Sequence, residues 1–174
     1  MATNMMKKEL KIIGANALIT VAGIKGIPAK VDTGASLSSI WASNVHVNDQ
    51  HQLEFTLLAP GHELYTGEVI KVDNYEVQQV RNSTGDVHMR YRVTLPATIK
   101  GKRILATFTL ANRSKNNFPV LIGRLTLKGK FLVDVSKDSI PTPPSMDNDG
   151  FNDELCKDPQ GFHQKYMSNG TYSK

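Results

Sequence analysis

An aspartate directly after an apolar, strand-like run is the residue whose setting points most clearly to chemistry. Asp32 follows residues 29–31 and is itself followed by Thr33 and Gly34. Gly34 has no side chain, so a water molecule or a second backbone can approach the Asp32 carboxylate closely. The Thr33 hydroxyl can bond to its counterpart in a facing copy, and Ala35 keeps the neighbourhood narrow. Such a carboxylate can activate water, although an Asp in a turn more often only shapes the turn.

A second pattern, in residues 118–127, places two bulky aliphatic residues before a glycine, an arginine and a short stretch that tolerates a helix. Leu121 and Ile122 are the aliphatic pair, and Gly123 and Arg124 follow. Together the two patterns resemble the retroviral-type aspartic proteases. In that fold the aliphatic-glycine segment packs beneath the catalytic loop.

The chain resembles more closely the bacterial retropepsin-like endopeptidases of the RimB kind, some of which carry the label ATP-dependent zinc proteases. Five stretches carry this resemblance, in order, over about two-thirds of the chain: 29–39, 81–90, 110–114, 119–125 and 131–136. The resemblance implies an all-β, retropepsin-like closed β-barrel (the acid protease fold) with one short C-terminal helix. It also implies an aspartic peptidase that acts as a homodimer with one catalytic Asp in each copy.

The resemblance assigns expected roles to single residues. Asp32 is the expected catalytic carboxylate, with Thr33 and Gly34 as its supports. The expected substrate-binding residues, of which 83–85 belong to a flap or cleft wall, are Ala35, Ser83, Thr84, Gly85 and Arg90. The expected structural support of the loop-helix junction is Ile122, Gly123 and Arg124. Ser36 departs from the viral pattern, which often has an Asp there, so substrate contacts cannot be copied from viral enzymes.

Hydrolysis of a peptide bond by water needs a base for the water and an acid for the leaving amine. Two carboxylates a few Å apart supply both, because like charges that close do not both ionise easily. The chain has one Asp-Thr-Gly and no Asp-Ser-Gly, so we expect twofold pairing to supply the second carboxylate. The alternatives within the chain are Asp86 and Asp134, and neither is followed by Thr/Ser-Gly.

The elements that must position these residues read as short strands separated by Gly, Asn, Asp or Pro. We predict strands at 10–13, 17–22, 27–31, 53–58, 68–72, 76–80, 87–99, 103–110 and 130–135. The sequence Thr84-Gly85-Asp86 predicts a hairpin tip, and residues 124–128 predict a short helix that Gly129 ends. From residue 138 proline and small polar residues bury little, so we predict a domain at 1–137 and a mostly disordered acidic tail at 138–174.

The charge is unevenly distributed. The tail holds three of the 21 Lys and Arg and six of the 16 Asp and Glu, so its formal charge is −3 and that of the body is +8. A basic body indicates an acidic partner, or only a solvated surface. The family resemblance makes that partner a glutamate-rich tail, added to a ribosomal protein by an ATP-grasp ligase. The alternative function is a non-catalytic dimeric β-barrel that binds acidic peptide or ribosomal RNA.

No cofactor or metal is expected. His62-Glu63 lacks a second histidine at the spacing of a zinc-binding helix, and there is no Gly-rich loop for ATP phosphates. Ser36, Ser38 and Ser39 lie near His46, but the Gly-x-Ser-x-Gly turn of a serine hydrolase is missing.

We expect a cytoplasmic protein without a membrane anchor. The single cysteine excludes an internal disulfide, which fits a reducing compartment. Residues 12–24 follow three lysines in the manner of a signal peptide, but Gly14, Asn16, Thr20 and Gly23 interrupt the apolar run.

Overall fold

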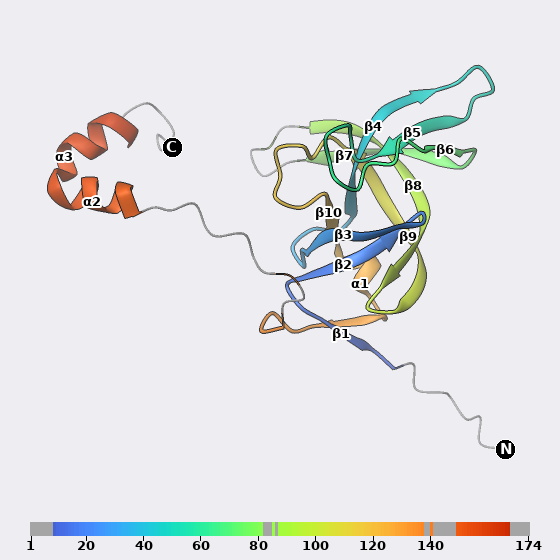
Figure 1. Cartoon of the computed structure of the whole chain (residues 1–174), viewed down its shortest axis with the longest axis horizontal. Helices are drawn as coiled ribbons and strands as arrows, with labels where there is room; N and C mark the ends of the chain where they lie inside the picture. Colours follow the sequence, from blue (N-terminus) through green and yellow to red (C-terminus); the bar gives the residue numbers. More distant parts are fainter. Residues whose placement is uncertain (1–8, 82–84, 86, 138–139, 141–148, 168–174) are drawn as a thin grey trace. The chain divides into compact units, whose positions relative to one another are not determined.

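The computed structural model describes residues 9–81, 85, 87–137, 140 and 149–167 (Figure 1). The chain divides into two compact units, Met1–Pro141 and Thr142–Lys174. All strands of the described residues lie in the first unit, as does the loop that contains Asp32. Within the described part of the chain, no helix has both the length and the apolar character needed to cross a membrane.

Among its described residues, the first unit has eleven strands and one helix. The strands are β1 (Lys11–Ile13), β2 (Asn16–Val21), β3 (Ile24–Val31), β4 (Ser38–Val47), β5 (Leu53–Leu57), β6 (Val69–Val72), β7 (Tyr75–Arg81), β8 (Val87–Ile99), β9 (Lys102–Ala111), β10 (Val120–Ile122) and β11 (Phe131–Val133). The helix is α1 (Arg124–Leu127), and Gly129 follows it with a φ of +67°, as expected for a glycine that ends a helix.

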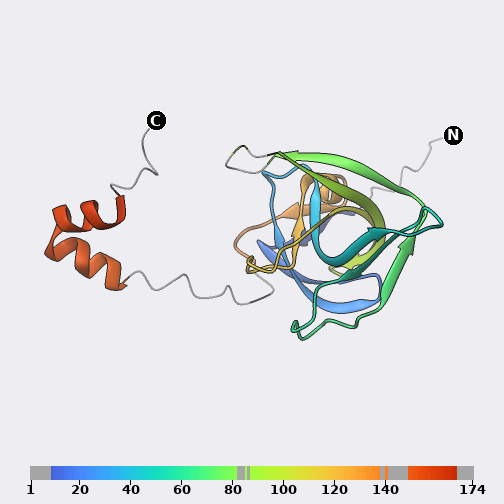
Figure 2. The same ribbon diagram turned by 90° about the horizontal axis from the view of Figure 1, so that it is seen from above.

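Six of the strands close into a barrel (Figure 2). Their order is β10-β3-β2-β8-β9-β4, and β10 closes the ring because it pairs parallel with β3 and antiparallel with β4. The all-β class, the closed barrel and the short helix predicted from the sequence are confirmed. Outside the ring, β5 and β6 extend the sheet from β4, and β7 pairs with β8.

The barrel forms because alternate residues of each strand are apolar and point inward. On β8, Val93, Leu95, Ala97 and Ile99 are buried while the residues between them are more exposed. Large side chains such as Phe108 fill the interior. Full burial of each such side chain contributes about 1.5–3 kcal/mol.

The β7–β8 hairpin is confirmed as predicted, with Arg81 opposite Val87 in the register. Of the five residues that connect the two strands, only Gly85 lies within the described part of the chain. The remaining small element is a parallel pair of β1 and β11, which joins the beginning and the end of the first unit.

The second unit contains α2 (Asp149–Lys157), α3 (Pro159–Phe162) and a π-helical turn (His163–Met167). Phe151, Phe162 and Tyr166 pack their rings together, and the Asp158 side chain accepts from the Gly161 backbone N–H at the start of α3. These helices are too short for their periodicity to be recognised in the sequence. The predicted boundary at 137 and the disorder of the tail stay predictions.

Candidate active site

The Asp32 loop connects the end of β3 to the start of β4. The half-buried Asp32 carboxylate turns back on its own loop, where Oδ1 accepts from the backbone N–H groups of Gly34 (2.9 Å) and Ala35 (3.1 Å). The Asp32 backbone N–H donates to the Ile122 carbonyl at 2.9 Å. The two N–H groups that follow Asp32 therefore orient its carboxylate, and β10 holds its backbone.

Beneath this loop, β10 and Gly123 pass so close to Leu37 that only a glycine fits. A Cβ at Gly123 would overlap the Leu37 carbonyl group. The Gly123 N–H donates to Ser38 Oγ at 3.0 Å, and Ser38 Oγ shares a second bond with Thr126 Oγ1 at 2.7 Å. The aliphatic-glycine segment thus packs against both ends of the loop.

Arg124, in the first turn of α1, forms several hydrogen bonds to the same loop. Its Nη1 donates to the carbonyls of Thr33 (2.9 Å) and Gly34 (2.6 Å), and its Nη2 donates to Ser36 Oγ (2.7 Å). Its backbone N–H also donates to the Ala35 carbonyl at 2.9 Å. All three residues expected to support the loop, Ile122, Gly123 and Arg124, contact it.

A cavity of about 470 Å³ opens beside the loop. It is bounded by the loop, by the β7–β8 hairpin and by the outward face of three barrel strands. Its lining residues are Gly34, Ala35, Ser36, Leu37, Ser39, Gln78, Gln79, Val80, Arg81, Arg90, Thr109, Arg113 and Leu121. Three of these residues are arginines and none is acidic, so the described lining favours a negatively charged ligand.

The expected substrate-binding residues are only partly brought together. Ala35 and Arg90 line the cavity. Gly85 lies at the end of the hairpin, where its carbonyl accepts from Arg81 Nη1 at 3.2 Å, and it is not among the lining residues. Ser83 and Thr84 lie outside the described residues.

Ser39 and Arg113 also line the cavity, and neither was among the site residues expected from the sequence. The half-buried Arg113 guanidinium donates from Nε to the Phe118 carbonyl at 3.0 Å. Burial lowers the pKa of Arg113, the nearby Arg90 lowers it further, and the Asp32 carboxylate opposes both effects. Arg113 is therefore within electrostatic reach of both Arg90 and Asp32.

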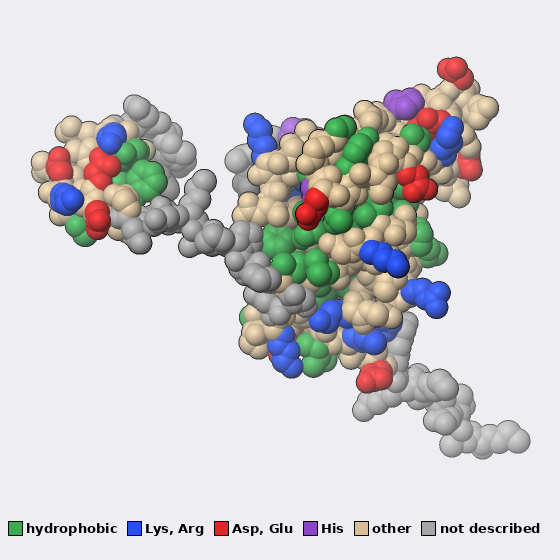
Figure 3. All heavy atoms as spheres, in the orientation of Figure 1, with side chains coloured by type: hydrophobic (Ala, Val, Ile, Leu, Met, Phe, Trp, Pro, Cys, Tyr) green, Lys and Arg blue, Asp and Glu red, His purple; other side chains and the backbone are tan. Residues whose placement is uncertain are grey.

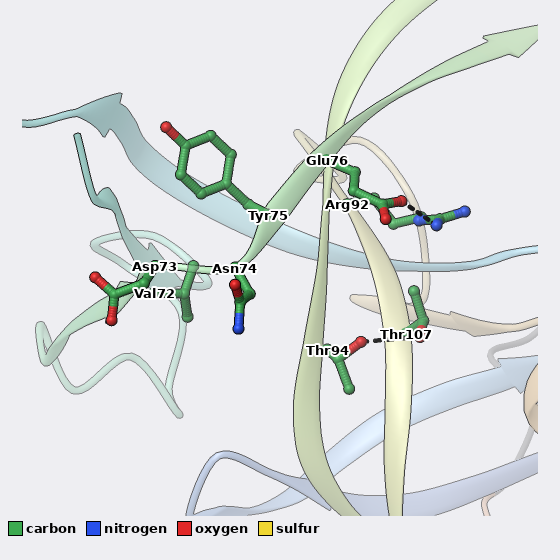
Figure 4. Close-up of a pocket in the computed structure, with 8 residues that line it drawn as sticks. All are labelled: Val72, Asp73, Asn74, Tyr75, Glu76, Arg92, Thr94 and Thr107. Carbon is green, nitrogen blue, oxygen red and sulfur yellow. Dashed lines mark hydrogen bonds and ion pairs between the residues drawn. The ribbon is translucent and has the colours of Figure 1, made fainter.

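A larger hollow of about 670 Å³ lies elsewhere on the first unit (Figure 4). It is lined by Val72, Asp73, Asn74, Tyr75, Glu76, Arg92, Thr94 and Thr107. The charged and hydroxyl groups on its β8 side are already paired, Arg92 with Glu76 and Thr94 with Thr107. It contains no residue of the Asp32 loop, so it is the weaker candidate for chemistry.

The part of the chain that the structure describes has no cluster of metal-binding side chains. Among those residues, no three His, Cys, Asp or Glu side chains gather as ligands for one ion. The absence of a metal or cofactor from the protein stays a prediction.

The chain matches one protein-family model and is similar in sequence to two curated proteins. A family model described as RimB-like, retropepsin-like aspartic endopeptidase RimB, matches residues 12–144. Two curated relatives are each named a probable alpha-L-glutamate ligase. The protein from Desulfotalea psychrophila is 28% identical over 138 residues, and the protein from Shewanella halifaxensis is 26% identical over 122. These matches cover 71% and 66% of this chain but 28% and 26% of the relatives, so the chain spans about a quarter of their length.

Among solved structures, a protein of unknown function from Legionella pneumophila has a TM-score of 0.57 with this chain. The two chains are 22% identical, and the match covers 74% of this chain and 96% of the other. At this identity the likeness shows a common fold.

Proposed function

The chain belongs to the RimB-like family of retropepsin-like aspartic endopeptidases, and we propose that it hydrolyses peptide bonds as a homodimer with Asp32 of each copy as one carboxylate. The observation that supports this most is the setting of Asp32. Its carboxylate is oriented by two backbone N–H groups, in a loop that Gly123 and Arg124 hold from below, beside a cavity of about 470 Å³.

The proposed reaction uses two carboxylates that share one proton. The ionised carboxylate takes a proton from water as the water oxygen attacks the peptide carbonyl carbon. The protonated carboxyl hydrogen-bonds to the carbonyl oxygen, and a proton then passes to the amide nitrogen. The C–N bond breaks and leaves a carboxylic acid and an amine, so the pair returns to its starting state.

The second carboxylate in this proposal comes from a second copy. Asp134, an alternative in the same chain, accepts from the N–H and the hydroxyl of Ser136 and lies 3.8 Å from Lys137 Nζ. These contacts occupy its carboxylate, and the bonds from Ser136 lower the pKa of Asp134, which opposes the protonated role. Asp86, the other alternative, lies outside the described residues.

An apolar hollow beside the Asp32 loop supports docking of a second copy. It has a volume of about 540 Å³ and is lined by Thr33, Ser36, Arg124, Leu125, Leu127, Lys128, Phe131 and Val133. Leu125 is 57% exposed there, which leaves a large apolar side chain in water. A second copy covers this surface and brings its own Asp32 to the same place, because a twofold interface repeats each contact.

The proposed substrate is a glutamate-rich tail that an ATP-grasp ligase adds to a protein, such as a ribosomal protein. Two observations support an acidic substrate: the body carries a formal charge of +8, and three arginines line the cavity. Lys and Arg side chains are also spread over the half of the first unit that carries β1 and β2 (Figure 3). In the two curated relatives, a segment similar to this chain is part of a longer protein named a glutamate ligase. A hydrolase that removes glutamate residues is a natural functional partner of such a ligase.

The second candidate function is a non-catalytic barrel that binds acidic peptide or ribosomal RNA, and the arginines of the cavity also favour it. The two candidates differ in their dependence on Asp32. An enzyme loses turnover when this carboxylate becomes an amide, whereas a binding protein keeps or gains affinity for an anion, because one negative charge is removed.

The test is hydrolysis of oligo-glutamate peptides by the wild type, by Asp32→Asn and by Asp49→Asn, a matched change at an exposed turn residue. We expect Asp32→Asn to lower turnover by a factor of about 10² or more while circular dichroism stays unchanged, and Asp49→Asn to be neutral. A parallel assay with EDTA is expected to show no loss. Wild-type turnover in a folded Asp32→Asn protein, or inactivation by EDTA that zinc reverses, would show that the proposal is wrong.

A further inference from the structure

The floor of the cavity beside Asp32 is a row of side chains across three strands. Ser39 on β4 lies opposite Thr109 on β9 and opposite Leu121 on β10 in the strand registers. Ser38 and Ile40, the neighbours of Ser39 on β4, are fully buried, and Ile40 belongs to the barrel core. Because side chains alternate along a strand, Ser39 faces away from the core and toward the cavity that it lines.

Ser39 is buried, and its hydroxyl has no hydrogen-bond partner among the described residues. The residue is 7% exposed, and no described group of the protein bonds to its hydroxyl. The adjacent Ser38 differs, because its hydroxyl bonds to both Thr126 and Gly123. A buried hydroxyl without a partner costs about 1–3 kcal/mol, so a ligand acceptor at this position would recover that free energy.

Arg113 offers donors to the same cavity. Its Nε bond to the Phe118 carbonyl fixes the guanidinium, and the described part of the chain supplies no acceptor for its two Nη groups. A guanidinium held in this way presents a planar pair of donors, which matches the two oxygens of a carboxylate. Arg90 lines the same cavity and adds a second positive charge.

The lining favours a carboxylate side chain of a peptide over a nucleic acid. Nucleic-acid bases bind by stacking on aromatic rings, and none of the described lining residues is aromatic. The cavity also begins at Gly34, two residues after Asp32, so a peptide with its scissile bond at Asp32 places a neighbouring side chain there.

We propose that Arg113 and Ser39 form a carboxylate-binding subsite that selects substrates with an acidic residue next to the scissile bond. The substrate carboxylate accepts two hydrogen bonds from the Arg113 guanidinium and one from the Ser39 hydroxyl, while Arg90 adds electrostatic attraction. The inference rests on the proposed peptidase function and assigns specificity residues within it.

The test compares kcat/KM for two peptides that differ only by Glu or Gln at the residue next to the scissile bond. We expect the wild type to prefer the Glu peptide. Arg113→Gln is expected to lower kcat/KM for the Glu peptide by about 10- to 100-fold, since a hydrogen-bonded charge pair is lost, and to change kcat/KM for the Gln peptide less than about twofold.

Two further variants and a control complete the test. Arg113→Lys is expected to restore part of the preference for the Glu peptide, and Ser39→Ala to lower this preference by about 2- to 10-fold. Arg103→Gln, at an exposed position near the start of β9, is the matched control and is expected to keep the wild-type preference.

Each other outcome has a definite meaning. If Arg113→Gln lowers kcat/KM equally for both peptides, Arg113 has only a structural role and the proposed subsite is wrong. If Arg113→Gln unfolds, Arg113→Lys and Ser39→Ala decide in its place, and an unchanged preference in both contradicts the inference. Failure of the peptidase proposal would look different, because the wild type would then hydrolyse neither peptide, or Asp32→Asn would leave hydrolysis unchanged. The affinity of the Asp32→Asn protein for the Glu and Gln peptides measures the subsite without any turnover, and equal affinities would contradict it.

Discussion

The crossing of Gly123 and Leu37 is where a single residue most constrains the site. A Cβ at position 123 would overlap the Leu37 carbonyl, which belongs to the backbone and can move only if the Asp32 loop moves with it. We therefore expect Gly123→Ala to lower the free energy of unfolding by about 3 kcal/mol or more and to abolish hydrolysis. Urea unfolding followed by circular dichroism measures the first effect.

Gly150→Ala is the matched control, because a Cβ at Gly150 meets no atom within 4 Å and alanine favours the surrounding helix α2. We expect it to leave the unfolding of the barrel unchanged. A Gly123→Ala protein with wild-type stability and turnover would mean that the backbone at Gly123 does not lie against the Leu37 carbonyl.

Site residues that are consecutive in the sequence were predictable. Site residues that only strand pairing brings together were not. Asp32, Thr33 and Gly34 are consecutive, so one turn places them together. Ser39 and Arg113 are 74 positions apart, and they meet only because β4 lies between β9 and β10. No local pattern marks a buried hydroxyl without a partner, so this part of the site required the structure.

The sequence predicted some strands well and missed others. Strands with regular apolar alternation, such as β8, match their predicted ranges. β4 was not predicted, because Ser, Asn and His interrupt its apolar residues, and β10 was not predicted, because it has only three. Yet β10 closes the barrel and lies beneath the Asp32 loop. Two of the strands that position the site, β4 and β10, are therefore ones that the sequence did not reveal, whereas β3 was predicted at 27–31.

The proposed dimer interface includes the exposed face of α1. Leu125 is 57% exposed, and it lines the apolar hollow together with Thr33 of the Asp32 loop. We expect Leu125→Asp to raise the dimer dissociation constant by about tenfold or more, because a charge would be buried in an apolar interface. Analytical ultracentrifugation over a range of concentrations measures this change.

Leu18→Asp is the control, because Leu18 is also an exposed leucine, at 52%, but lies on β2 and does not line the hollow. We expect Leu18→Asp to have the same dimer dissociation constant as the wild type. If both variants weaken the dimer equally, or neither does, the second copy docks on another surface.

At the scale of the whole chain, the question is where the barrel unit ends. The sequence predicted a boundary at 137, whereas the structure pairs Ile140 with the buried Asn16: Asn16 Nδ2 donates to the Ile140 carbonyl at 3.0 Å and Ile140 N–H donates to Asn16 Oδ1 at 2.9 Å. We expect a chain that ends at Pro141 to melt at the temperature of the full chain. A chain that ends at Lys137 loses both bonds and is expected to be less stable by about 1–3 kcal/mol. Differential scanning calorimetry compares the two, and equal melting temperatures would place the boundary at 137.

The assembly of two chains is tested by the dependence of activity on concentration. If each cleft needs one Asp32 from each copy, specific activity falls as the protein is diluted through its dimer dissociation constant. Added Asp32→Asn subunits form heterodimers with only one carboxylate. An equal mixture is then expected to leave about half of the activity per wild-type subunit, because about half of these subunits are paired with an inactive one. The Leu125→Asp and Asp32→Asn double variant serves as the control, since a subunit that dimerises more weakly should inhibit less. Constant specific activity in a solution that sedimentation shows to be monomeric would mean that one chain supplies both acids, and the twofold mechanism would be wrong.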